Sequence, residues 1–251
     1  MNTPFIRDNT ILKLSDISKY YGNIKALNAI NISLHSREII GLIGADSAGK
    51  STLTKIIGGL EQPDSGLLYI DGIPTKFKSA HEARQHGIEI ISSEDTLSPS
   101  LDVAHNIFIG RWPRTLGIFL DKKTMYADAR KLLDQIGLGY ISEKQLTGEL
   151  SGGLRHVISV ARAISFHPKI IVFDEPMMHL SVTMSEYFIS LMRQLKESGV
   201  CQVFATRRPQ EALKVCDRII VMRYGQVIAE VSDQSINETS ESELAALMIG
   251  A

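Results

Sequence analysis

Nine consecutive residues have the types and spacing of a loop that binds phosphate groups. They are Gly44, Ala45, Asp46, Ser47, Ala48, Gly49, Lys50, Ser51 and Thr52, which fit the pattern G-x-x-x-x-G-K-[ST]. In such a loop, backbone N–H groups surround the phosphates of a nucleotide. The lysine, here Lys50, reaches the β- and γ-phosphates, and the hydroxyl of Ser51 coordinates Mg²⁺. The segment therefore predicts a site for a nucleotide with Mg²⁺.

The residues on either side have the patterns that would position this loop. Residues 38–43 are largely apolar, which is typical of a buried parallel strand. A short helix is expected after Lys50, and Gly58 and Gly59 would end it. The N-terminus of that helix would direct its positive end at the same anion. The order strand, loop, helix favours a functional loop over a chance match to a permissive pattern.

A second candidate site consists of two adjacent carboxylates, Asp174 and Glu175. They directly follow the apolar run 170–173. Ligands bind α/β sheets at the carboxyl ends of parallel strands, where these side chains would lie. Asp174 suits the holding of Mg²⁺ through water, and Glu175 suits the polarisation of an attacking water. Paired carboxylates are common on surfaces, so the pair alone is weak evidence for a site. It gains support from the buried strand before it and from the phosphate loop.

A third motif is Ser151-Gly152-Gly153, which precedes a helical stretch ending near residue 164. Serine is a good N-cap, and the two glycines would expose backbone N–H groups to an anion. Taken alone, the motif indicates only the capped start of a helix.

Bulk properties limit the class of protein. The chain has 251 residues, is 44% hydrophobic and carries a formal net charge of −1. The length suffices for one large α/β domain or two small ones, and the composition is typical of a globular protein. The near-neutral charge gives no overall positive field that would attract nucleic acid. No apolar run approaches the roughly 18–20 residues that span a bilayer, and residues 1–10 lack a signal core, so a cytoplasmic protein is expected. Cys201 and Cys216 are expected to be reduced packing residues.

Hydrophobic periodicity predicts the elements around these motifs. Alternation in residues 11–34 and a pair turning at Asp71-Gly72 predict a small antiparallel sheet. The pattern is helical from about 98 to 163, and strand–helix alternation after Ile170 predicts a mainly parallel sheet. A hairpin is expected to turn at Tyr224-Gly225, before a polar tail that ends in an amphipathic piece, 243–249.

The order and spacing of the three motifs resemble the ATP-binding subunit of ABC transporters over nearly the whole chain. Tyr21 matches the family's adenine-stacking aromatic. Residues 106–111, 216–219 and 241–250 resemble the monosaccharide-importer group (ribose, galactose and xylose types). Many members of that group fuse two such halves in one chain, and single-half members also occur.

This resemblance implies an α/β fold with a mainly parallel core sheet, a small antiparallel β subdomain and an inserted helical subdomain. In one domain spanning 1–251, residues 1–95 and 165–230 would form the nucleotide-binding core. Residues 96–164 would form the helical signature subdomain, and residues 231–251 the tail.

The resemblance also implies partners. Two such domains would dimerise head to tail, so that Ser151, Gly152 and Gly153 of one contact the ATP held by the phosphate loop of the other. Transmembrane permease subunits and, indirectly, an extracytoplasmic solute-binding protein would complete the importer. The chain would lie peripherally on the inner face of the cell membrane, with no role in binding nucleic acid.

The chain departs from the family pattern at several positions. Ser47 replaces a usual glycine and would be strained if its φ is positive. Counting back from Pro99 gives Ser93 where the family has the glutamine that touches Mg²⁺ and water, with Glu94 beside it. Arg207 stands at the switch-histidine position; arginine can hold a phosphate but cannot accept a hydrogen bond from water.

The departures leave several hypotheses open. The chain is predicted to be a Mg²⁺-ATP hydrolase of a sugar importer, with Lys50 and Glu175 as catalytic residues. Alternatively, it is a nearly non-catalytic partner that completes the ATP site of a second ABC domain. A third, less favoured hypothesis is a cytosolic ABC ATPase with no membrane partner.

Overall fold

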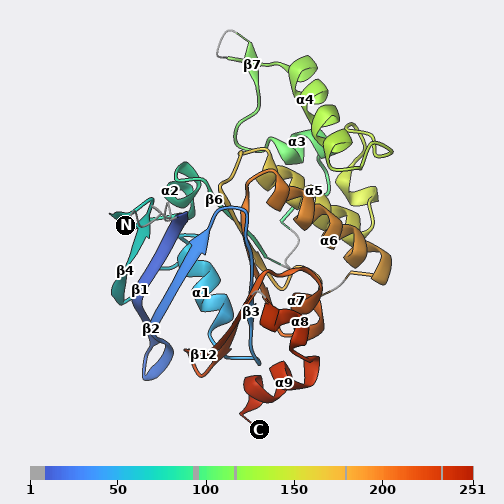
Figure 1. The fold of residues 1–251 in the computed structure, drawn as a ribbon. Coiled ribbons are helices and arrows are strands. Elements are labelled where there is room, and N and C mark those ends of the chain that lie inside the picture. Colours follow the sequence, from blue (N-terminus) through green and yellow to red (C-terminus); the bar gives the residue numbers. More distant parts are fainter. Residues whose placement is uncertain (1–8, 93–95, 116–117, 179, 233, 251) are drawn as a thin grey trace, which may run out of the picture.

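A six-stranded sheet forms the centre of the molecule in the computed structural model, which describes residues 9–92, 96–115, 118–178, 180–232 and 234–250 (Figure 1). Neighbouring strands of this sheet run parallel to each other, except in the antiparallel hairpin β11–β12, which turns at Tyr224-Gly225 as predicted. The mainly parallel sheet is thus confirmed, although the sequence patterns did not reveal β6. The strands in spatial order are β12 (Gln226–Ser232), β11 (Arg218–Arg223), β3 (Ile39–Ile43), β10 (Cys201–Thr206), β9 (Ile170–Asp174) and β6 (Ile88–Ser92).

A second, four-stranded antiparallel sheet lies beside the first (Figure 1). It confirms the predicted antiparallel sheet, including the turn at Asp71-Gly72. Its strands in spatial order are β2 (Ile24–His35), β1 (Thr10–Tyr21), β4 (Ser65–Ile70) and β5 (Ile73–Thr75).

The central strands are buried on both faces, and their alternating side chains feed two separate cores. In β9, Ile170 and Val172 join the core that includes the antiparallel sheet, whereas Ile171 and Phe173 join the core on the other face. Because successive side chains of a strand point to opposite faces, a continuous apolar run is what a doubly covered strand requires.

Helices cover both faces of the central sheet. Helix α1 (Lys50–Ile57) packs between the two sheets, with Leu53, Ile56 and Ile57 buried in the shared core. On the other face lie α6 (Val182–Glu197), α7 (Pro209–Val215) and α9 (Glu241–Ile249), as Figure 1 shows. Two shorter helices lie at the edges of the sheet: α2 (Ala80–Gln85) contributes Ala83 to the core on the α1 face, and α8 (Gln234–Glu238) contacts β12.

A group of helices forms the upper part of the molecule in Figure 1. They are α3 (Val103–Ile107), α4 (Lys122–Gln135) and α5 (Gly152–Ile164), with a 3₁₀ turn at Thr147–Glu149. This confirms the helical pattern between 98 and 163, but a projecting hairpin, β7 (Arg114–Thr115) and β8 (Phe119–Leu120), was not predicted. Its two-residue strands are too short to give a periodic signal.

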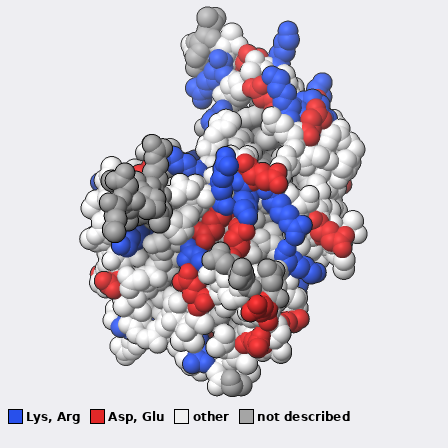
Figure 2. All heavy atoms as spheres, viewed as in Figure 1, with Lys and Arg blue, Asp and Glu red and all other residues white. Residues whose placement is uncertain are grey.

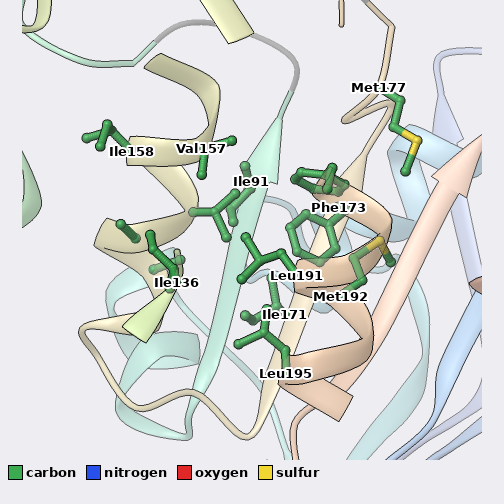
Figure 3. Packing of buried hydrophobic residues seen from close by; sticks show 14 of the residues in the cluster. Ile91, Ile136, Val157, Ile158, Ile171, Phe173, Met177, Leu191, Met192 and Leu195 are labelled. Carbon is green, nitrogen blue, oxygen red and sulfur yellow. The ribbon is translucent and has the colours of Figure 1, made fainter. Parts of the chain in front are cut away.

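The core on the α6 face joins these upper helices to the central sheet. Figure 3 shows Val157 of α5 near Ile91 of β6, and Leu191 of α6 beside Phe173 of β9. The rings of Phe173 and Phe188 meet edge to face, with centroids 5.2 Å apart. One continuous core therefore connects the carboxyl ends of the strands to α5.

Two further expectations concern cysteines and membrane segments. Cys201 and Cys216 are free and buried, as expected of packing residues. None of the helices in the described ranges is long and apolar enough to span a bilayer.

Candidate nucleotide-binding site

The predicted site residues meet where the parallel strands end. Ile43 at the end of β3 pairs in register with Thr206 of β10, and Ala205 of β10 pairs with Asp174 of β9. The residues that follow, Gly44, Glu175 and Arg207, consequently leave the sheet at one edge. Topology alone thus brings together motifs that lie more than a hundred residues apart in sequence.

The backbone of the phosphate loop requires small residues at two positions. A Cβ on Gly44 would lie 2.5 Å from the carbonyl oxygen of Met222. Gly49 has a φ of 101° and is the N-cap of α1. Ser47 has a φ of 64°, so this serine carries the backbone strain that was expected if its φ is positive.

Lys50 is buried at the centre of the loop. Its Nζ donates hydrogen bonds to the carbonyl oxygens of Gly44 at 2.8 Å and Ala45 at 3.1 Å. It also faces Oε1 of Glu175 at 3.9 Å. The loop thus turns its one buried cation toward the acidic residue after β9.

Burial perturbs both members of this ion pair. Burial lowers the pKa of Lys50, and the nearby carboxylates, of which Glu175 has the largest effect, act in the opposite direction. Burial likewise raises the pKa of Glu175, opposed by the charge of Lys50 and by the backbone N–H of Arg207, which donates to the carboxylate. A carboxylate with a raised pKa is the stronger base, as a group that accepts a proton from water should be.

Ser51 and Asp174 are the residues that could hold a metal. The Ser51 hydroxyl donates to Oδ1 of Asp174 at 3.2 Å, so two oxygen ligands of the kind that Mg²⁺ prefers lie together. In the described part of the chain, no group of three or more His, Cys, Asp or Glu side chains could hold a metal. The pair therefore fits a Mg²⁺ that takes its remaining ligands from phosphate and water.

Arg207 lies at the site instead of pointing away from it. Its Nη1 is 3.7 Å from Oδ2 of Asp46 in the phosphate loop. This side-chain pairing was not predicted, because nothing in the sequence indicates which loop residue faces the end of β10. The other departure, Ser93, and its neighbour Glu94 lie outside the described residues.

One cleft of about 590 Å³ is lined by Lys50, Ser51, Glu175 and Arg207. Tyr21 is among its lining residues, and its hydroxyl donates to Glu61. Five lining residues were not predicted as site residues, because their role depends on how separate turns meet; they are Ile24, Lys25, Ala26, Met178 and Tyr224. The lining comprises Tyr21, Ile24, Lys25, Ala26, Asp46, Ser47, Ala48, Gly49, Lys50, Ser51, Thr52, Glu175, Met178, Arg207 and Tyr224.

The third motif does not line this cleft. Ser151 is the N-cap of α5, and its hydroxyl accepts a hydrogen bond from the backbone N–H of Leu154 at 3.4 Å. Ser151 and Gly152 are exposed, and a Cβ on Gly152 would meet no atom within 4 Å. The motif is therefore open to a molecule outside this chain.

Comparison with known protein families identifies the family that has this arrangement of motifs. The family model described as "ABC transporter" matches residues 27–178, which include the phosphate loop, Ser151-Gly152-Gly153 and both carboxylates. The chain belongs to this family. The architecture agrees, since an ATP-binding cassette of an ABC transporter solved in its ADP conformation superposes with a TM-score of 0.84 at 27% identity, covering 96% of this chain and 99% of that one.

Curated relatives of this ABC chain are sugar-import proteins. The Ribose import ATP-binding protein RbsA of Hahella chejuensis is 36% identical over 242 residues, which are 96% of this chain and 48% of the relative. The Xylose/arabinose import ATP-binding protein XylG of Sulfolobus acidocaldarius is 36% identical over 93% of both chains. The chain thus spans about half the length of the first relative and nearly all of the second.

Proposed function

We propose that this chain is the ATP-binding subunit of an ABC importer for a simple sugar and that it hydrolyses ATP to drive transport. The observation that carries the proposal is the single cleft lined by Lys50, Ser51 and Glu175, with Asp174 in hydrogen-bond contact with Ser51. The names of the curated relatives support the sugar and the direction of transport.

The residues of the cleft have distinct parts in this proposal. The backbone N–H groups from Ala45 to Thr52 surround the phosphates, and Lys50 exchanges its two carbonyl partners for phosphate oxygens. Glu175, with its raised pKa, orients the attacking water and accepts its proton. Tyr21 stacks on the adenine.

Ser51 and Asp174 hold the Mg²⁺, Asp174 through water. When bound, Mg²⁺ neutralises phosphate charge that develops during transfer. Arg207 adds a permanent positive charge beside the phosphate loop, where it suits the γ-phosphate.

The exposed motif at Ser151, Gly152 and Gly153 serves a second ABC domain. Its backbone N–H groups and serine hydroxyl are available at the start of a helix of 13 residues, which suits the γ-phosphate held by the partner. A head-to-tail dimer, homomeric or heteromeric, would thus complete two ATP sites. An ATP-binding cassette solved as a dimer in a post-hydrolysis state with ADP and Pi, at a TM-score of 0.74 and 27% identity, supports dimerisation.

The rest of the chain would couple this dimer to transport. Residues 1–95 and 165–230 form the nucleotide-binding core, 96–164 the helical subdomain that contacts the permease subunits, and 231–251 the tail. We place the importer subunit on the inner face of the membrane, with the extracytoplasmic solute-binding protein acting indirectly. On the face in Figure 2, Lys and Arg form a band across the middle, with Asp and Glu directly beside it. The formal net charge of −1 supports a chain without a nucleic-acid partner.

Nucleotide titration of a matched pair of lysine variants tests the proposed site. Lys50→Ala removes the buried cation, whereas Lys55→Ala removes an exposed lysine of the same helix that pairs with Glu61 at 3.6 Å. Charged hydrogen bonds contribute about 1.5–3 kcal/mol, so the first variant should bind MgATP at least about tenfold more weakly. Equal affinity in both variants would refute the phosphate site. Co-purification with a multi-span permease tests the importer assignment.

A second candidate function rests on Arg207 and Ser93. If these residues replace a histidine and a glutamine needed for hydrolysis, the chain binds ATP and completes the site of a catalytic partner. In that case Ser151→Arg would abolish the ATPase of the complex, whereas Glu175→Gln would leave it almost unchanged.

A further inference from the structure

Three large apolar side chains are exposed around the opening of the nucleotide cleft. The exposed fractions are 45% for Tyr21, 70% for Ile24 and 82% for Tyr224, and all three line the cleft. Exposed apolar side chains that gather at one concave place mark a binding surface more often than isolated ones do. Tyr21 already has a proposed part in base binding, whereas Tyr224 has none.

The turn that carries Tyr224 is fixed to the elements that form the cleft. The backbone N–H of Gly225 donates to the carbonyl oxygen of Ala48 in the phosphate loop at 3.1 Å. The carbonyl oxygen of Gly225 accepts from the N–H of Asn28 in β2 at 2.8 Å. These two bonds fix the turn, and with it the backbone of Tyr224, beside the phosphate loop.

A tyrosine is an unfavourable choice for this turn on local grounds. Tyr224 and Gly225 have φ values of 49° and 72°, so they form a two-residue hairpin turn with positive φ at both positions. Asparagine or aspartate is preferred at the first position, because a bulky residue is strained there. Within the described residues, the Tyr224 hydroxyl has no hydrogen-bond partner that would offset this strain.

We propose that Tyr224 is a second base-binding aromatic of the nucleotide site. Its ring packs against the purine base at the opening of the cleft, in addition to Tyr21. This inference rests on the proposed nucleotide function. Because every base has an aromatic face, such packing distinguishes nucleotides from base-free polyphosphate.

The test measures the affinities of the full chain for MgATP and for magnesium tripolyphosphate, which lacks base and ribose. Tyr224→Asn suits the positive φ of the turn, so it should not lower the melting temperature, yet it removes the ring. Tyr224→Phe keeps the ring. Tyr140→Asn serves as the control, because Tyr140 is 74% exposed and does not line the cleft.

We expect Tyr224→Asn to bind MgATP about five- to tenfold more weakly, with unchanged tripolyphosphate affinity, from the strength of base–aromatic stacking. Tyr224→Phe and Tyr140→Asn should match the wild type. Unchanged MgATP affinity in Tyr224→Asn would overturn the inference while leaving the nucleotide site intact. An equal loss for both probes would assign Tyr224 to loop structure and also overturn it. Failure of the wild type to bind either probe would overturn the nucleotide site itself, and with it the inference.

Discussion

The guanidinium of Arg207 faces the carboxylate of Asp46, with Nη1 and Oδ2 3.7 Å apart. The side chains are 45% and 81% exposed, so this ion pair adds little to folding stability. The ion pair instead positions Arg207, because it keeps a permanent positive charge at the loop that is proposed to bind phosphate.

Replacing Arg207 tests whether this charge serves the γ-phosphate. Arg207→Ala should weaken MgATP binding about tenfold, the lower end for a charged hydrogen bond, and should leave MgADP binding nearly unchanged. Arg208→Ala is the matched control, since Arg208 pairs with Glu211 at 3.0 Å instead. Calorimetric titration of both nucleotides checks this. The same affinities in Arg207→Ala and the wild type would show that Arg207 does not contact nucleotide.

The signature serine gives a prediction that depends on a second domain. Ser151→Arg should abolish ATP turnover of the assembled complex, because the bulky cation would occupy the position proposed for the partner's ATP. ATP binding by the isolated chain should persist, since Ser151 does not line its own cleft.

Ser79→Arg controls for the lost helix cap in this experiment. Ser79 caps α2 by the same hydrogen bond, from the N–H of Glu82 at 3.3 Å. Loss of either cap should cost about 1 kcal/mol of stability. Turnover that falls equally in both variants would attribute the effect to folding and not to the trans contact.

The raised pKa of Glu175 predicts a stability that depends on pH. An acid with a raised folded-state pKa binds its proton more tightly when folded, so its contribution to stability declines as pH rises from the unfolded pKa through the folded one. Glu175→Gln removes this decline.

In the nucleotide-free protein, Glu175→Gln should therefore melt above the wild type at pH 7.5. The difference should shrink as pH falls toward the ordinary glutamate pKa of about 4.3. Scanning calorimetry at several pH values measures the difference in melting temperature and its dependence on pH. A variant that melts below the wild type at neutral pH would mean that the lost attraction to Lys50 outweighs the relief of burying a carboxylate.

Sequence patterns predicted the parts of the site that continuous motifs define. Lys50, Ser51 and Asp174 follow from loop and strand patterns, because parallel strands buried on both faces need unbroken apolar runs. Strand β6 was missed, although residues 88–91 are largely apolar, since Glu89 interrupts them and is buried beside Arg84.

Contacts between separate turns could not be predicted in this way. Tyr224 was recognised only as part of a turn, because its place beside Ala48 depends on the packing of the β11–β12 hairpin. The positive φ of Ser47 is likewise set by the surrounding loop and not by the serine itself. Such relationships depend on tertiary structure, which local patterns do not contain.

ATP turnover by the chain in complex with its co-purified permease, compared between the wild type and Glu175→Gln, tests the central proposal most directly. If Glu175 accepts the proton of the attacking water, the variant should turn over about 10²- to 10⁴-fold more slowly while binding MgATP as tightly as the wild type. Equal turnover in the two proteins would contradict the account and favour a chain that binds ATP only to complete the site of its partner.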